Sequence, residues 1–138
     1  MKRLLLAALL LGTAPAVLAQ TTPATPSAAV PTSSSVPVAP LAEVQAQLAQ
    51  PAAVLLDVRT PAEFAAGHLP GALNLDFRAP DFAQRAAQLN PKGTYVLYCA
   101  SGNRSGKAAA HLQQQGFSQV TNAGAYQSLQ EQKVGKPQ

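Results

Sequence analysis

The chain has 138 residues, a length suited to one domain, and it carries ten basic residues, six acidic residues and a single cysteine. Lys2 and Arg3 fall in a segment that we expect to be removed, which leaves eight basic residues against the six acidic ones. This small excess, with no basic stripe and no set of stacking aromatic residues, argues against a nucleic-acid partner. One cysteine also excludes an internal disulfide.

The first 19 residues have the pattern of a cleavable secretory signal peptide. Lys2 and Arg3 form a basic start, residues 4–11 are apolar, and Val17 and Ala19 provide small side chains before the cut. The apolar run is too short to span a bilayer, and no cysteine follows the cut to carry a lipid. We therefore expect residues 1–19 to be a signal peptide cut after Ala19, and the mature protein to be periplasmic or secreted without a stable membrane anchor.

Residues 20–40 consist almost wholly of Thr, Pro, Ala, Ser and Val and carry no charge. Proline removes backbone donors and favours extended backbone, so this composition predicts a flexible or semi-extended linker. The rest of the chain is predicted to be a domain over residues 41–134, long enough for one hydrophobic core, followed by a short tail over residues 135–138.

The first half of the domain alternates between helix and strand patterns. Apolar residues at 41, 44 and 48 predict a helix over residues 41–48, and the nearly all-apolar run 53–58 predicts a strand buried on both faces. Thr60, Pro61 and Glu63 form a capping box that starts a short helix through about residue 66. Gly67 is expected to end that helix in a left-handed conformation.

The second half continues the alternation. The predicted elements are a strand over 72–75, a helix over 82–89 capped by Asp81, a strand over 94–98, a helix over 104–115 ending at Gly116, a strand over 118–122, and a helix near 126–132 preceded by Gly124. Such an alternation predicts an α/β fold with a mostly parallel central sheet and helices on both faces. Ligands bind at the carboxyl ends of such strands, where Asp57 and Cys99 fall.

Residues 99–105, Cys-Ala-Ser-Gly-Asn-Arg-Ser, are the most informative segment. Cys99 lies between a predicted strand and a predicted helix, where backbone N–H groups lack partners and the helix dipole is positive. Both effects favour the thiolate, the nucleophilic form of cysteine. An inert buried cysteine is the alternative, but an unpaired thiol outside the cytoplasm risks oxidation, and the neighbouring Gly102 and Arg104 suggest an open site.

Three further motifs accompany this loop in a fixed order: Leu-Leu-Asp-Val-Arg at 55–59, Pro-Ala-Glu-Phe at 61–64 and Gly-His-Leu-Pro-Gly-Ala at 67–72. Together they resemble the rhodanese family over about residues 53–129. The resemblance implies an α/β rhodanese-like domain and transfer of sulfane sulfur through a persulfide on Cys99. The implied donor is thiosulfate or a persulfide, and the implied acceptor is cyanide or a thiol.

The catalytic residue of this hypothesis is Cys99, with an anion-binding loop around its sulfur. The loop residues are Ala100, Ser101, Gly102, Asn103, Arg104 and Ser105. Arg104 could either orient the substrate or brace the loop. No cofactor is expected, and two distant histidines with one cysteine do not have the spacing of a metal site.

Four residues are assigned supporting roles. Asp57, Arg59 and Glu63 fall near the expected active-site edge, where charge-assisted bonds could brace the cysteine loop. Ordinary ion pairing and helix capping also account for these three. His68 is interpreted as a turn residue more readily than as a base.

Two alternative functions remain open. Cysteine-based phosphatases and arsenate reductases resemble this arrangement but place arginine six positions after cysteine, whereas Arg104 follows Cys99 by five. The shorter loop favours sulfur over phosphate. The other alternative is a module that only carries a persulfide or binds a partner, without turnover.

Overall fold

The computed structural model describes residue 12 and residues 34–137, so the predicted signal peptide and most of the predicted linker lie outside the described residues. All described helices and strands belong to one compact unit, Pro31–Gln138. Along the described part of the chain, no helix is both long enough and apolar enough to cross a membrane.

A four-stranded sheet lies at the centre of this unit, in the order β2-β1-β3-β4. The strands are β1 (Val54–Asp57), β2 (Leu73–Asn74), β3 (Thr94–Cys99) and β4 (Gln119–Ala125). Each neighbouring pair runs parallel. The predicted α/β fold with a parallel central sheet is therefore confirmed.

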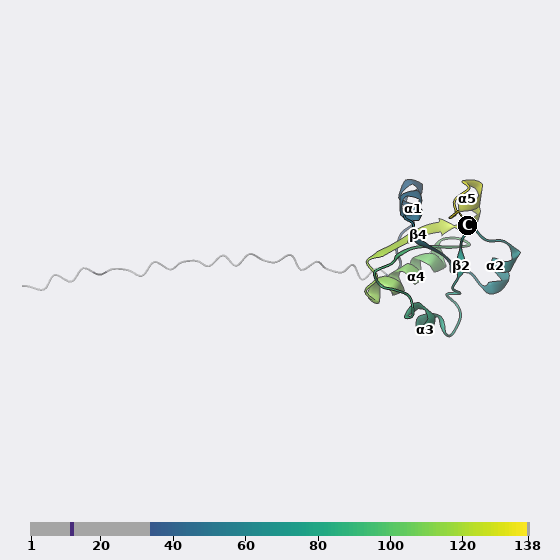
Figure 1. Cartoon of the computed structure of the whole chain (residues 1–138). Helices are drawn as coiled ribbons and strands as arrows, with labels where there is room; N and C mark the ends of the chain where they lie inside the picture. Colours follow the sequence, from purple (N-terminus) through teal and green to yellow (C-terminus); the bar gives the residue numbers. More distant parts are fainter. Residues whose placement is uncertain (1–11, 13–33, 138) are drawn as a thin grey trace, which may run out of the picture. The chain divides into compact units, whose positions relative to one another are not determined.

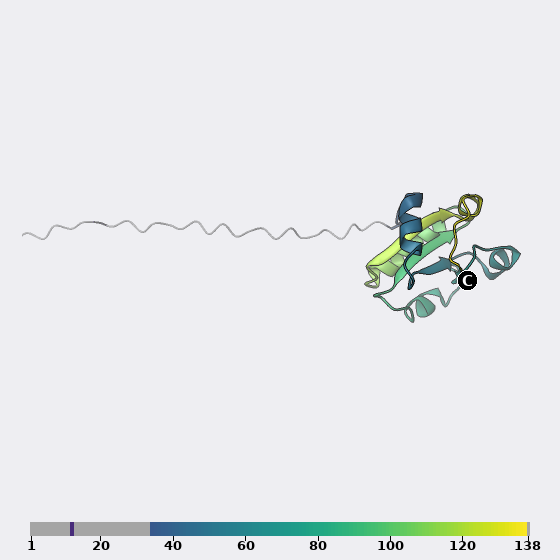
Figure 2. The same cartoon turned by 45° about the horizontal axis from the view of Figure 1, so that its top comes forward.

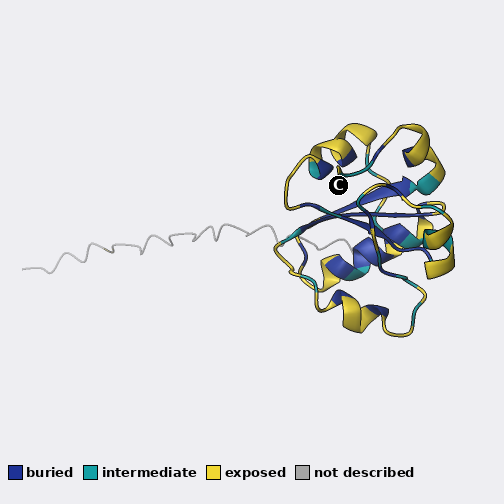
Figure 3. Cartoon of the chain, turned by 45° about the vertical axis from the view of Figure 1, so that its right-hand side comes forward, coloured by how far each residue is buried: buried dark blue, intermediate teal, exposed yellow. Residues whose placement is uncertain are grey.

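Helices cover both faces of the sheet (Figures 1 and 2). On one face lie α1 (Leu41–Leu48) and α5 (Tyr126–Glu131), and on the other lie α3 (Phe82–Ala86) and α4 (Asn103–Gln114). The short helix α2 (Pro61–Ala66) follows the carboxyl end of β1. The strands are buried between these layers while the helices keep exposed outer surfaces (Figure 3).

Side chains of β3 alternate between the two helical layers. Val96 and Tyr98 belong to the core cluster under α1 and α5, whereas Leu97 and Cys99 belong to the cluster under α3 and α4. This period-two alternation follows from the pleat of a strand. It places the only sulfur of the described domain on the α4 side, at the end of the strand.

Helix α2 begins as the sequence predicts but ends differently. The Thr60 hydroxyl accepts the Glu63 N–H, and the Glu63 carboxylate accepts the Thr60 N–H at 2.9 Å, which completes the capping box. Gly67 ends the helix with φ 156° and ψ 140°, so the predicted left-handed conformation is wrong. At this positive φ, which side chains other than glycine rarely adopt, the Gly67 carbonyl accepts a hydrogen bond from the Arg59 guanidinium at 2.7 Å.

Two other element boundaries differ from the prediction by more than one residue. Helix α3 ends at Ala86 instead of residue 89, and Asp81 makes no capping hydrogen bond through its side chain. Strand β4 continues to Ala125, because the register slips by one residue where Leu97 pairs with Asn122 and Tyr98 with Gly124. Gly124, at φ 93°, allows this bulge inside the strand. It does not simply precede the last helix.

The domain begins earlier than the predicted boundary at residue 41. Residues 35–39, here called the strap, lie along the free edge of β4, where Val38 forms an isolated parallel bridge with Asn122. The Val36 N–H donates to the Gly106 carbonyl at 2.9 Å, and the Ala39 N–H donates to the Asn122 carbonyl at 2.8 Å. The end of the predicted linker is thus an ordered part of the domain, because an edge strand offers backbone groups that an extended segment can satisfy.

The C-terminal segment is also part of the domain. Val134 is buried, and the Lys136 N–H donates to the Pro70 carbonyl at 2.9 Å. The Lys136 ammonium donates to the carbonyl groups of Gln50, Pro51 and Ala53, just beyond the end of α1. Most of the predicted tail, residues 135–137, therefore joins α1 to the loop before β2.

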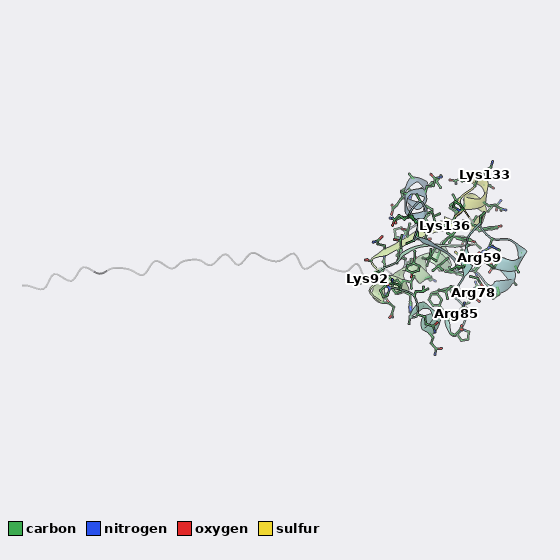
Figure 4. All side chains as sticks on the ribbon, in the orientation of Figure 1. Arg59, Arg78, Arg85, Lys92, Lys133 and Lys136 are labelled. Atoms are coloured by element: carbon green, nitrogen blue, oxygen red, sulfur yellow. The ribbon has the colours of Figure 1, made fainter. Side chains whose placement is uncertain are left out.

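Basic side chains are spread around the unit (Figure 4). Lys133 lies beside α5 at the top of that view, and Arg85 lies on α3 at the bottom. The two belong to opposite helical layers, so they do not form one cationic face.

Candidate active site

Cys99 is the last residue of β3, and it has no solvent exposure. Its sulfur accepts the Gly102 N–H at 3.0 Å and lies 3.5 Å from the Ser105 hydroxyl oxygen. Helix α4 begins at Asn103, so the sulfur lies against the first turn of a helix. The strand, the loop and the helix thus surround the thiol with donors.

These donors lower the pKa of the Cys99 thiol. Burial raises the pKa of Cys99, but the Ser105 hydroxyl and the backbone N–H groups of Ser105, Ser101 and Gly102 lower it. The donors outweigh burial, so the pKa lies below the ordinary value of 9.0. The site therefore favours an anionic sulfur.

Gly102 sets the path of the loop. Its φ of 89° lies in the left-handed region, which side chains other than glycine rarely adopt. A Cβ atom at this position would lie 3.2 Å from both the Gly124 Cα and a methyl group of Val38. The loop is therefore pressed against the bulge of β4 and against the strap.

Arg104 and Glu63 form a bidentate ion pair, with N–O distances of 2.9 and 2.8 Å. The hydrogen bonds from Arg104 hold the pKa of Glu63 well below its usual range, and Glu63 raises the pKa of Arg104. Both terminal nitrogens of the guanidinium are thus committed to Glu63. This contact joins the first turn of α4 to α2, and the supporting role of Glu63 in the chemistry stays a prediction.

Asp57 and Arg59 pair with one another, and neither side chain hydrogen-bonds to residues 99–105 of the cysteine loop. Arg59 donates through Nε at 2.9 Å and through a terminal nitrogen at 2.6 Å to the Asp57 carboxylate, and both residues are buried. The guanidinium carbon lies 4.1 Å from the centre of the Tyr126 ring. The bracing role predicted for these two residues is wrong, because the pair joins β1 to Gly67 and α5 instead.

His68 lies away from the sulfur-binding loop. Its ring stacks on Phe64 with centroids 3.8 Å apart, and its Nδ1 lies 2.9 Å from the Phe64 carbonyl oxygen. The side chain is exposed at the end of α2, which agrees with a turn residue. Over the described residues, no three His, Cys, Asp or Glu side chains come together as metal ligands would.

Asn122, which is 1% exposed in β4, is a site residue that was not predicted from the sequence. Its amide nitrogen donates to the carbonyl groups of Val36, at 2.8 Å, and Gly102, at 3.2 Å. Its amide oxygen accepts the Ser105 hydroxyl, at 2.7 Å, and the Gly124 N–H, at 3.1 Å. Asparagine is disfavoured in strands, and this was the available signal in the sequence.

The Ser105 hydroxyl has one proton and two acceptors. The Asn122 oxygen lies at 2.7 Å and the Cys99 sulfur at 3.5 Å, so the resting hydroxyl donates to Asn122. A thiolate can recruit the same proton by rotation of the hydroxyl. Asn122 then keeps the Gly124 N–H, so its buried oxygen does not lose every partner.

A cavity of about 280 Å³ adjoins the loop at Ser101. It lies between the strap, α1 and α5, and none of its lining side chains is ionisable. Val38, Leu41 and Leu129 supply apolar surface, whereas Ser128 and Gln132 supply polar groups. The cavity has the size of a small-molecule subsite at the lower end of the usual range.

The fold and this loop define a class of protein: a parallel α/β domain with one cysteine at a helix N-terminus, where backbone donors lower the pKa of the thiol. A model of the rhodanese-like domain matches residues 40–131. The chain belongs to the rhodanese family.

Named relatives agree with this assignment. A sulfurtransferase of Allochromatium vinosum is 42% identical over 69 residues, which are 50% of this chain and 63% of that protein. The thiosulfate sulfurtransferase GlpE of Stutzerimonas stutzeri is 42% identical over 69 residues, or 49% of this chain and 61% of that protein. These matches therefore span less than two thirds of either relative. The human single-domain sulfurtransferase TSTD1 superposes with a TM-score of 0.58 and 30% identity, covering 72% of this chain and 99% of TSTD1.

Proposed function

We propose that this protein is a sulfurtransferase in which Cys99 carries sulfane sulfur as a persulfide. The observation that carries the proposal is the Cys99 sulfur, which accepts the Gly102 N–H at 3.0 Å and has a pKa below its ordinary value. The names of the relatives support the same activity. A buried thiolate with backbone donors is both nucleophile and anion site.

The proposed reaction has two steps, with thiosulfate as the donor. The Cys99 thiolate attacks the outer sulfur, a new S–S bond forms, and the bond to the sulfonate sulfur breaks so that sulfite leaves with the electron pair. A thiolate or cyanide then attacks the outer sulfur of the persulfide and releases the Cys99 thiolate. Each preorganised N–H donor in the loop can lower such a barrier by about 3 kcal/mol.

Arg104 has a bracing role in this proposal. Because Glu63 engages both of its terminal nitrogens, the guanidinium is not free to clamp a substrate. The same contact argues against the phosphatase and arsenate reductase alternatives, since those reactions need the arginine on the transferred oxyanion. Phosphate release from an aryl phosphate should accordingly be negligible beside sulfur transfer.

Mass spectrometry tests the central step directly, because Cys99 is the only cysteine in the chain. Incubation with thiosulfate, or separately with glutathione persulfide, should add one sulfur atom, and cyanide should then remove it with formation of thiocyanate. Cys99→Ser is the matched control. If neither donor adds sulfur to the unaltered protein, the proposal fails; loading without repeated turnover would favour the carrier alternative.

We also propose that the protein is exported from the cytoplasm and that its signal peptide is cleaved after Ala19. The basic start and apolar run of residues 1–11 support it. Expression of the full chain in a bacterium should give a periplasmic product whose mass corresponds to residues 20–138. A cytoplasmic product that retains Met1 would contradict it.

A further inference from the structure

We propose that Asn122 is a positioning residue through which the docked strap holds the sulfur-binding loop in place. This inference rests on the proposed function of Cys99 and adds a regulating contact to it. Asn122 does not touch the sulfur. It touches Gly102 and Ser105, which do.

Asn122 links two segments that are distant in the sequence. Its two amide protons go to the carbonyl groups of Val36 in the strap and Gly102 in the loop. Because both of these partners are acceptors, the amide can adopt only one orientation, with its oxygen towards Ser105 and Gly124. The strap therefore helps to decide which atom of Asn122 faces the Ser105 hydroxyl.

The strap also contacts the loop without Asn122. A Cβ atom on Gly124 would lie 2.9 Å from a Val38 methyl group, and one on Gly102 would lie 3.2 Å from another. Val38 thus covers the two glycines at which loop and bulge meet. Val38 is nevertheless 56% exposed. Its contact with the two glycines therefore explains an apolar residue at this position better than its own burial does.

Gly106 provides a way to displace the strap while residue 122 stays asparagine. A Cβ atom there would collide with the Ser35 hydroxyl oxygen, and it would lie 2.8 Å from the Val36 carbonyl oxygen and 3.1 Å from the Asn122 amide nitrogen, so it presses on both partners of the Val36–Asn122 hydrogen bond. Alanine is a better helix former than glycine, so Gly106→Ala favours α4 while it displaces the strap. Lys107→Ala, one position along the same helix and exposed, is the matched control.

The test measures how fast iodoacetamide alkylates Cys99 across pH in the full-length protein, together with the rate of persulfide loading from thiosulfate. Asn122→Asp keeps the acceptor for Ser105 but removes both amide protons, and it should slow alkylation at neutral pH by about tenfold, equivalent to one pKa unit. Gly106→Ala, which adds no charge, should slow it by about threefold. Lys107→Ala should match the unaltered protein.

A double variant distinguishes positioning from general destabilisation. If the strap acts through Asn122, Gly106→Ala should have little further effect on alkylation once Asn122→Asp is present. Should Gly106→Ala not fold, Val38→Ala replaces it, with Leu73→Ala as the control, since Leu73 is 60% exposed on β2 at the opposite edge of the sheet.

Two results would overturn the inference. In the first, the strap variants lower the melting temperature but leave the alkylation profile of Cys99 unchanged. In the second, the effects of the strap variant and of Asn122→Asp on alkylation simply add. A failure of the proposed function is recognised separately, because the unaltered protein would then take up no sulfur at all while its alkylation profile could still be measured.

Discussion

Arg104 and Glu63 join two helices at the mouth of the cysteine loop through N–O contacts of 2.9 and 2.8 Å. Glu63 also closes the capping box of α2 with Thr60. One carboxylate therefore serves the start of α2 and the first turn of α4. A change at Glu63 should act on helix capping and on the position of the loop, and these two effects can be separated.

Glu63→Gln should remove the ion pair and keep the capping box, because the glutamine amide oxygen can also accept the Thr60 N–H. Glu63 is 35% exposed, so water screens the pair and the loss in free energy of unfolding should be about 1 kcal/mol. Glu63→Ala should lose about 1 kcal/mol more, because the cap is also removed. Urea unfolding of the three proteins measures both steps, and equal losses would contradict a separate capping role.

The pH dependence of that difference has a definite sign. The folded-state pKa of Glu63 lies below its ordinary value of 4.5, so its contribution is fully present above that value. It is lost as the pH falls through the folded-state pKa. The stability gap between the unaltered protein and Glu63→Gln should therefore be constant near neutral pH and narrow in acid. A gap that widens below pH 4.5 would refute this assignment.

Ser105→Ala should raise the pKa of Cys99, because the hydroxyl is one of the donors that lower it. Asn122 would keep the Gly124 N–H as a partner for its oxygen, so the effect should be concentrated on the thiol. Alkylation of Cys99 near neutral pH should slow by roughly three- to tenfold, the equivalent of half to one pKa unit. Ser118→Ala, at an exposed serine after α4, is the control. An unchanged midpoint would show that the backbone N–H groups alone set the pKa.

Gly102→Ala and Gly116→Ala form a matched pair. Their φ angles are 89° and 92°, so alanine meets similar backbone strain of about 1–2 kcal/mol at each site. A Cβ atom at Gly116 meets no atom within 4 Å, whereas at Gly102 it meets Gly124 and Val38. Both variants should lose stability, but only Gly102→Ala should slow persulfide loading. Equal loading rates would mean that the loop tolerates displacement.

The buried pair of Asp57 and Arg59 should matter for stability and not for the thiol. Arg59→Leu leaves a buried carboxylate unpaired, which should cost about 3–5 kcal/mol. Adding Asp57→Leu should recover part of that loss, since both charges are then gone. Denaturant unfolding measures the stability of the unaltered protein, the single variant and the double variant. The pH at the midpoint of Cys99 alkylation should stay the same in every variant that remains folded. A further loss in the double variant would contradict this account.

The features that could be predicted from the sequence depend mostly on residues that are close together along the chain. The capping box at Thr60 and Glu63 and the placement of Cys99 between strand and helix depend on residues within a few positions of each other, and the structure confirms both.

Contacts between distant segments could not be predicted. Val36 and Asn122 are 86 positions apart, and 41 positions separate Arg104 from Glu63. Val36 was assigned to the linker from composition, because a proline-rich segment without charges is typical of unstructured chain. Its pairing with the edge of β4 depends on a strand that is distant in the sequence. The bulge at Gly124 was hidden for a similar reason, since it depends on the register against β3.

The alternation of side chains along β3 limits how this strand can change. Thr94 to Cys99 are six successive buried residues, and each faces the layer opposite to its neighbours. Inserting or deleting one residue before Cys99 would turn the sulfur towards α1 and α5, away from every donor of its loop. A related chain could therefore keep the sulfur next to these donors only if β3 changes by substitution, or by insertion or deletion of two residues at a time. Either change leaves Cys99 on the same face of the sheet.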